Sequence, residues 1–137
     1  MKASNELINT LKCIELKDTF MLQEIEVLCK DIEDTKLIEP LFYVFENNPD
    51  FNFGNPGNLV RIIEKFFLDP VYEKELYRSI ERKPTEYNLW MLNRLLNTFD
   101  EDRKKTGLKL LINTMNDSKL SENLKDIAKD FFEEQTE

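Results

Sequence analysis

The sequence predicts an all-α fold, and three observations support this prediction. Glycine and proline, the residues that interrupt helices, number only 3 and 5 among 137 residues, and no low-complexity stretch is present. Apolar residues recur at intervals of three and four nearly throughout the chain, which is the periodicity of amphipathic helices. No segment alternates with period two for long enough to indicate a strand.

We expect about eight helices of 10–16 residues, joined by short turns. Each is a periodic apolar segment that begins at a residue suited to a helix N-terminus. The expected ranges are about 4–14, 18–32, 36–47, 56–67, 70–82, 86–98, 100–115 and from 121 onward.

The N-termini of the first three helices are indicated by different residues. Ser4 and Asp18 are polar residues that accept hydrogen bonds from the first turn of a helix, so they are expected to cap the first and second helices. Pro40 lies early in the third, where proline is tolerated in the first turn or produces a kink. The chain then enters its one substantial loop, residues 48–55.

The later helices begin at proline pairs or at capping residues. Asn55 before Pro56 and Asp69 before Pro70 both have the pattern of a cap followed by proline at the first helical position. The remaining three helices are expected to start at Thr85, Asp100 and Ser121.

These helices are expected to form one domain over residues 1–137. Sequential helices with short connections pack as antiparallel neighbours. Pairing them gives four hairpins of roughly 30–35 residues, a length that suits a HEAT-like α-solenoid. A compact orthogonal helical bundle is the alternative.

The charge of the chain bears on the class of its partner. The net charge is −8, from 27 acidic and 19 basic side chains, which disfavours nucleic acid because phosphate binding needs a basic face. Residues 1–56 carry −6, residues 57–110 carry +2 and residues 111–137 carry −4. Acidic ends would attract a basic partner, although acids that only keep the chain soluble would give the same composition.

Further features of the sequence indicate where the protein is located and whether it binds a cofactor. No stretch approaches the ~20 apolar residues that span a bilayer, and the first residues lack the features of a signal peptide. Cys13 and Cys29 are most simply reduced core thiols of a cytoplasmic protein, the alternatives being a redox pair or a metal site. Two cysteines without histidine cannot complete a four-ligand zinc site unless carboxylates help, so no cofactor is expected.

The sequence also lacks the residues of common catalytic sites. The absence of histidine excludes the usual Ser-His-Asp and Cys-His mechanisms. No P-loop pattern is present, and Gly54–Gly57 is too short for a dinucleotide fingerprint. We therefore expect no enzymatic activity, with an enzyme that relies on carboxylates alone as the alternative.

The helix expected over 86–98 contains the first candidate binding residues. Its leucines gather on one side of a helical wheel, while Trp90, Arg94 and Asn97 fall on the opposite side with Asn93 beside them. Tryptophan and arginine are frequent anchors of protein interfaces, so these four are candidate partner-binding residues. Packing of Trp90 against a second helix is the alternative.

Two further regions supply candidate binding residues. Phe51 and Phe53 lie in the polar loop, where aromatic side chains either fold back into the core or contact a partner. The second helix is rich in acids, which either meet lysines of a partner or are simply solvated. The candidates from these regions are Phe51, Glu24, Asp31 and Asp34.

Three segments in the middle of the chain form a recognisable pattern. They are FGNPGNLV at 53–60, a region from Tyr72 through Lys83-Pro84-Thr85, and LWMLNRLLN at 89–97. In these segments the chain resembles a bacterial immunity-protein family encoded beside contact-dependent or other polymorphic toxins. The resemblance covers about 37–100, and the flanking acidic segments lie outside it, where toxin specificity would reside.

The resemblance implies a helical antidote that binds a cognate toxin domain tightly in the cytoplasm. Many such toxins are nucleases with basic faces, which would suit the acidic charge. We therefore expect an immunity protein that acts by a stoichiometric complex, with no catalytic residues. A helical adaptor for another partner is the alternative, and the oligomeric state is left open.

Overall fold

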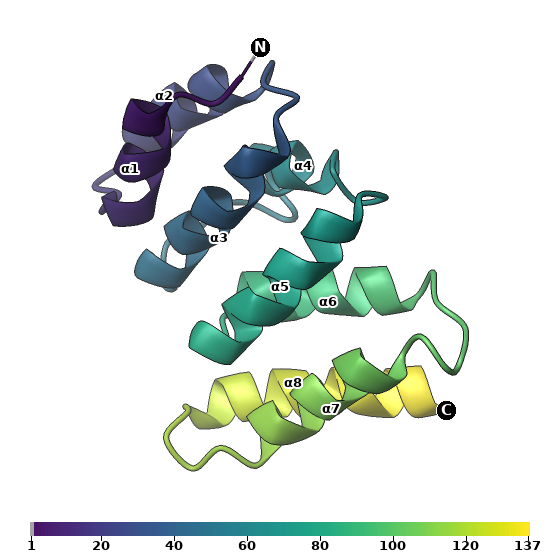
Figure 1. The fold of residues 1–137 in the computed structure, drawn as a ribbon. Coiled ribbons are helices and arrows are strands. Elements are labelled where there is room, and N and C mark those ends of the chain that lie inside the picture. The colour runs from purple at the N-terminus through teal and green to yellow at the C-terminus, as the bar shows by residue number, and fades with distance from the viewer. Residues whose placement is uncertain (1) are drawn as a thin grey trace. The chain divides into compact units, whose positions relative to one another are not determined.

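The computed structural model describes residues 2–137, and that range is all-helical, as the sequence predicts (Figure 1). The helices form two compact units, with unit 1 ending at Glu75 and unit 2 spanning Leu76–Glu137. No helix within residues 2–137 has the length and apolarity needed to cross a membrane. The α-helices are α1 (Asn5–Cys13), α2 (Thr19–Cys29), α3 (Ile38–Asn47), α4 (Asn58–Glu64), α5 (Pro70–Arg82), α6 (Glu86–Leu96), α7 (Lys105–Met115) and α8 (Glu122–Thr136), and the 3-10 helix η1 (Thr35–Leu37) precedes α3.

Four of the predicted N-caps are confirmed. In each, the side-chain oxygen accepts a hydrogen bond from the backbone N–H three residues later, which satisfies one of the donors left unpaired at a helix start. These caps are Ser4, Asp18, Thr85 and Ser121, with distances of 3.1, 2.9, 3.1 and 3.2 Å.

The predicted start of a helix at Pro56 is wrong, because α4 begins at Asn58. Gly57 precedes it with φ +87°, a backbone conformation outside the helical range that glycine adopts readily. A Cβ at Gly57 would lie 1.7 Å from the Phe53 carbonyl oxygen, so the loop closes onto its own backbone there. The Asn55–Pro56 peptide bond is cis.

Two other predicted bounds also need correction. The segment after Asp100 forms turns, and α7 begins only at Lys105. The Asp100 side chain still accepts the N–H of Arg103 at 2.9 Å, so the capping signal marks a turn before the helix. The second helix ends at Cys29 and not near Ile32.

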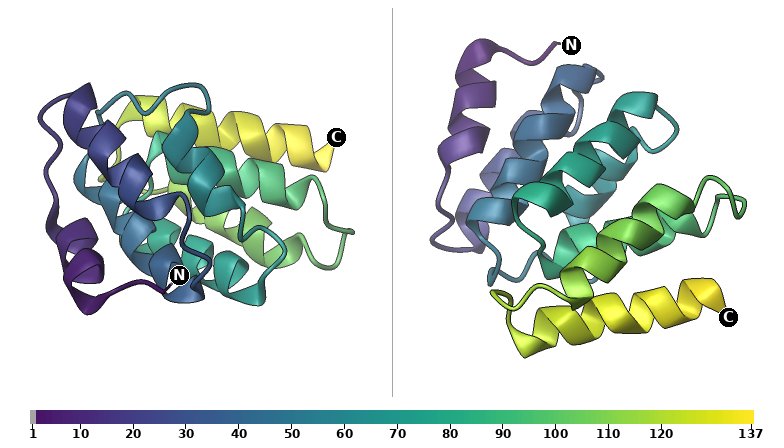
Figure 2. Two further views of the ribbon diagram at one scale, coloured as in Figure 1. Left: turned by 90° about the horizontal axis from the view of Figure 1, so that it is seen from above. Right: turned by 60° about the horizontal axis from the view of Figure 1, so that its bottom comes forward.

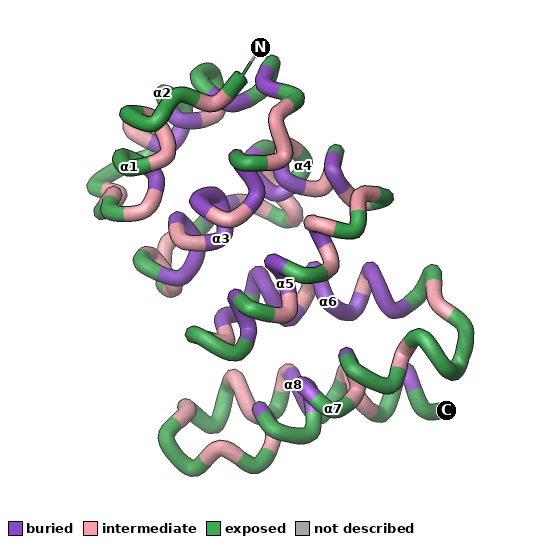
Figure 3. The backbone as a smooth tube through the Cα atoms, viewed as in Figure 1, coloured by how far each residue is buried: buried purple, intermediate pink, exposed green. Residues whose placement is uncertain are grey.

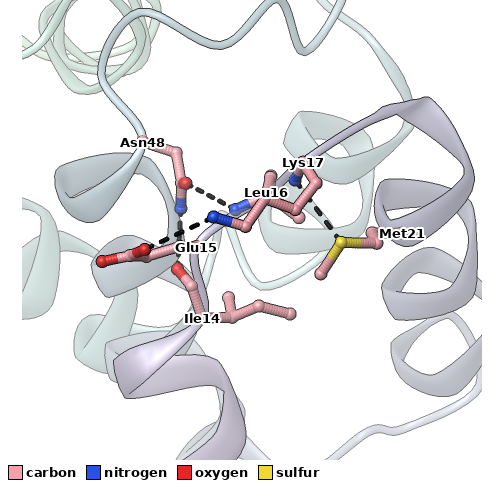
Figure 4. A network of polar contacts seen from close by, with 6 residues as sticks. All are labelled: Ile14, Glu15, Leu16, Lys17, Met21 and Asn48. Carbon is pink, nitrogen blue, oxygen red and sulfur yellow. Dashed lines mark hydrogen bonds and ion pairs between the residues drawn. The ribbon is translucent and has the colours of Figure 1, made fainter.

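In unit 1, α1 packs against α3 and α2 packs against α4 (Figure 2). Lys12 of α1 pairs with Glu39 of α3 at 3.0 Å. The connection between α1 and α2 is fixed to the end of α3 by Asn48, whose side chain donates to the Ile14 carbonyl at 3.0 Å and accepts from the Leu16 N–H at 2.8 Å (Figure 4). Two polar anchors therefore hold α1 on α3.

In unit 2, α8 packs against both α6 and α7. Most of α6 is buried, as the tube coloured by burial shows (Figure 3). Asn88 is fully buried, and its side chain donates to Ser79 Oγ at 3.0 Å and to the Lys83 carbonyl at 2.9 Å. It also accepts the Thr85 N–H at 2.8 Å and completes a capping box, so it fixes the turn between α5 and α6.

Candidate protein-binding face

The outward side of α2 carries large apolar side chains in contact with solvent. The exposed fractions of Phe20, Val27 and Leu28 are 66%, 63% and 58%. The core side of the same helix is occupied by Leu22 and Ile25, which are nearly fully buried. The helix is therefore apolar on two sides, and within residues 2–137 only one of them is covered.

Acidic residues lie among these apolar side chains. Glu24 and Asp31 are both exposed, and with Phe20 and Val27 they follow the spacing of three and four that places residues on one helical side. Leu28 borders them, and Asp31 lies in the turn directly after the helix. We call these five residues, Phe20, Glu24, Val27, Leu28 and Asp31, the α2 strip.

A groove of about 590 Å³ runs beside the α2 strip, between α2 and α4. Val27 borders both the strip and the groove, and Ile62 supplies a second apolar wall. The groove is therefore an apolar channel whose rims are polar. We call it the α2–α4 groove; its lining residues are Gln23, Glu26, Val27, Lys30, Asn58, Arg61, Ile62 and Lys65.

Basic side chains occupy the groove and have different roles. The Lys65 ammonium donates to the carbonyls of Lys30 at 3.1 Å and Cys29 at 3.4 Å, so it satisfies acceptors at the C-terminus of α2. Lys30 and Arg61 are exposed. The groove thus has a basic character, in contrast to the acidic α2 strip.

Two titratable groups of α2 respond to burial. Burial raises the pKa of Glu26 above 4.5, while a hydrogen bond with the backbone of Leu59 acts in the opposite direction. Burial raises the pKa of the Cys29 thiol to about 11, partly offset by the positive charge of Lys65. Cys29 therefore stays a protonated core thiol at neutral pH.

Cys13 is exposed, so the expectation that it is a core residue was wrong.

The other candidates from unit 1 are engaged within the chain. Asp34 accepts the N–H groups of Ala3 at 3.1 Å and Lys36 at 3.0 Å, and these bonds lower its pKa. Asp34 therefore caps η1 and holds the N-terminal segment. Phe51 is half-buried against Phe53, with ring centroids 5.3 Å apart, and Phe53 is 3% exposed. The loop aromatics thus fold back toward the core.

The candidates on α6 lie in unit 2, and two of them are bonded to α8. The Gln135 side-chain NH₂ donates to Asn93 Oδ1 at 2.8 Å and to Asn97 Oδ1 at 2.7 Å. Trp90 is half-buried, with its ring 6.5 Å from that of Tyr87, and Arg94 is also half-buried. The asparagines therefore have a structural role, and binding of a partner by this group stays a prediction.

Sequence reasoning found the acids of the α2 strip but not its apolar residues. Leu28 follows Ile25 at a spacing of three, which predicts a position on the core side of the helix, whereas its side chain is 58% exposed. A signal for the others was present in the sequence. Phe20 and Val27 lie seven residues apart, away from the core stripe, so they had to share a second apolar side.

Neither a cluster of metal-ligating residues nor a matching protein indicates the function. Within residues 2–137, no group of three or more His, Cys, Asp or Glu side chains is placed to hold a metal ion. Comparison with protein-family models, with curated proteins and with solved structures gave no match to this chain. The exposed surface of the chain is therefore the basis for a functional proposal.

Proposed function

We propose that this chain is an immunity protein that binds a cognate toxin domain and neutralises it by forming a stoichiometric complex. The observation that carries the proposal is the α2 strip, in which three large apolar side chains are 58–66% exposed. Apolar groups gathered on a surface and rimmed by polar residues mark protein interaction sites. Binding would bury them and gain roughly 25 cal/mol per Å² of apolar surface removed from water.

The charge around α2 supports a basic partner. Residues 15–34 hold 7 acidic and 2 basic side chains, a net charge of −5. A local negative potential speeds the encounter with a basic protein surface and suppresses the approach of acidic ones. A toxin domain with a basic face, such as a nuclease, fits this potential.

The position of the strip also supports the proposal. The α2 strip lies outside the region 37–100 that resembles immunity proteins. Within that region, Gly57 shapes the loop before α4, and Thr85 caps α6. The resembling residues thus include several that shape the fold. A variable binding face on a shared scaffold would give each family member its own toxin.

The proposal includes a HEAT-like order of helices and a cytoplasmic location. In unit 1, α1 pairs with α3 and α2 pairs with α4, so each helix packs against the helix two positions along the chain. This is the pairing expected where helical hairpins stack in layers, as in α-solenoids. A toxin that acts on cytoplasmic targets must be met there by its antidote.

Co-expression tests the function directly. Cells that express the toxin domain encoded by the adjacent gene should stop growing, and simultaneous expression of this chain should restore growth. The purified chain should form a complex of fixed stoichiometry with a catalytically inactive form of the same domain. Persistent growth arrest in cells that contain the folded chain would contradict the proposal and leave a helical adaptor as the alternative.

A further inference from the structure

We infer that the α2 strip and the α2–α4 groove together bind an amphipathic helix of the partner whose two flanks carry opposite charges. Basic side chains of that helix lie over Glu24 and Asp31, acidic side chains lie over Lys30 and Arg61, and apolar side chains enter the groove between Val27 and Ile62. The inference rests on the proposed function and specifies how the partner is recognised.

Charges of opposite sign lie on either side of Val27. At 100° per residue, Glu24 lies roughly 60° to one side of Val27 and Lys30 roughly 60° to the other. Lys30 lines the groove with Arg61 of α4, whereas Glu24 and Asp31 do not line it. An apolar ridge thus separates the acidic side from the groove, whose exposed Lys30 and Arg61 outnumber its one carboxylate, Glu26.

The shape of the surface suits a helix. The groove lies between α2 and α4, which pack against each other. A channel between two packed helices accepts the side-chain ridge of a third helix, and apolar anchors at intervals of three and four are typical of this mode. The apolar walls at Val27 and Ile62, with exposed Phe20 further along the strip, provide contacts for such anchors.

The charge of this face disfavours other classes of occupant. A second copy of the chain would bring together two segments that each carry −5 over residues 15–34, and like charges at short range repel. Nucleic acid and anionic lipid surfaces are repelled by the same acids. A partner helix with one basic and one acidic flank satisfies both sides of the ridge.

The first experiment reverses the acidic side and measures the Kd for the inactive toxin domain encoded by the adjacent gene. Glu24→Lys with Asp31→Lys should raise the Kd at least about tenfold, because both partner contacts become repulsive. The matched control is Asp126→Lys with Glu133→Lys, an exposed Asp and Glu with the same spacing of seven residues on α8 and the same change in net charge. The control should change the Kd about threefold or less.

The second experiment distinguishes two explanations of binding: matching of charges at the groove, and general attraction of a basic domain to an acidic chain. Arg61→Glu makes the net charge two units more negative, from −8 to −10, so attraction by net charge alone predicts tighter binding of a basic domain. Our inference predicts the opposite, a Kd raised about tenfold, because an acidic flank of the partner loses its counter-charge. Lys109→Glu, at an exposed position of α7, makes the same charge change and should not weaken binding.

The outcomes distinguish the two proposals. Failure of the unmodified chain to bind the toxin domain overturns the proposed function, and this inference with it. If Arg61→Glu and Lys109→Glu change the Kd equally, the inference alone is overturned. The same holds if the charge reversals on α2 and on α8 weaken binding equally. Light scattering measures whether the unmodified chain is a dimer. A dimer that Phe20→Ser converts to a monomer would show that a second copy of the chain occupies this face, and would also overturn the inference. Circular dichroism of each variant confirms that it is folded.

Discussion

The α2 helix of unit 1 and the α6 helix of unit 2 use their two sides in opposite ways. On α2, apolar side chains point outward, with Val27 63% exposed. On α6, Asn93 of the polar side is held inside the unit, where it is 6% exposed and bonded to Gln135. The polarity of a helix side therefore does not by itself show whether that side faces the core or a partner.

Hydrogen bonding explains the difference. A buried amide is tolerated when it is hydrogen-bonded, and the buried side chain of Gln135 donates to Oδ1 of buried Asn93 and to Oδ1 of exposed Asn97. An exposed apolar side chain finds no such compensation in water. Its free energy is lowered only when another surface covers it. Of the two helix faces compared, the α2 strip is thus the one whose free energy is lowered when a partner covers it.

The largest expected effect on stability is at Asn88, in the first turns of α6. Asn88→Ala removes three hydrogen bonds and leaves buried groups of Ser79 and Thr85 without this partner. The free energy of unfolding should fall by about 2–4 kcal/mol, measured by urea denaturation. Asn113→Ala, at an exposed asparagine of α7, serves as the control and should change it by less than about 0.5 kcal/mol.

A smaller effect on stability is expected at Gln135. Gln135→Ala removes the bonds to Asn93 and Asn97 and should lower the free energy of unfolding by about 1–2 kcal/mol. The Kd for the toxin domain should stay within about twofold of the unmodified value. A large loss of affinity in a fully folded variant would instead assign this group to the interface.

The reverse result is expected for the α2 strip. Phe20→Ser with Val27→Ser replaces two exposed apolar side chains, so the free energy of unfolding should change by less than about 1 kcal/mol. The Kd for the toxin domain should rise at least about tenfold, because anchors that are buried on binding are lost. Unchanged affinity would break the comparison between α2 and α6.

The smallest expected effect concerns pH and Glu26. Because its pKa in the folded chain is raised above 4.5, the folded chain binds a proton more readily than the unfolded chain. This group therefore lowers stability as pH rises from about 4.5 through the raised pKa. Glu26→Gln should remove that part of the pH dependence in unfolding measured between pH 4 and pH 7. An identical pH profile in both proteins would exclude the burial effect.

The sequence predicted the fold class and most helices because the signals for them are local. The caps at Ser4, Asp18, Thr85 and Ser121 are confirmed since each needs only its own first turn. The start of α4 was not predicted, because the loop before it closes through the backbone of Gly57.

The candidate site was predicted only in part. Glu24 and Asp31 could be recognised as acids on a helix, but which side of α2 is covered depends on α4, a helix distant in sequence. For the same reason Arg61 and Ile62 were not candidates. The bond from Gln135 to Asn93 joins residues 42 positions apart, which no local pattern indicates.

Binding to the α2 strip can be followed by NMR of the chain labelled at its methyl groups and with 15N, recorded with and without the inactive toxin domain. We expect the methyl signals of Val27, Leu28 and Ile62 to shift on binding, while the indole N–H signal of Trp90 in the 15N spectrum stays in place. Shifts confined to Trp90 and its neighbours on α6, with the α2 signals unchanged, would contradict this expectation.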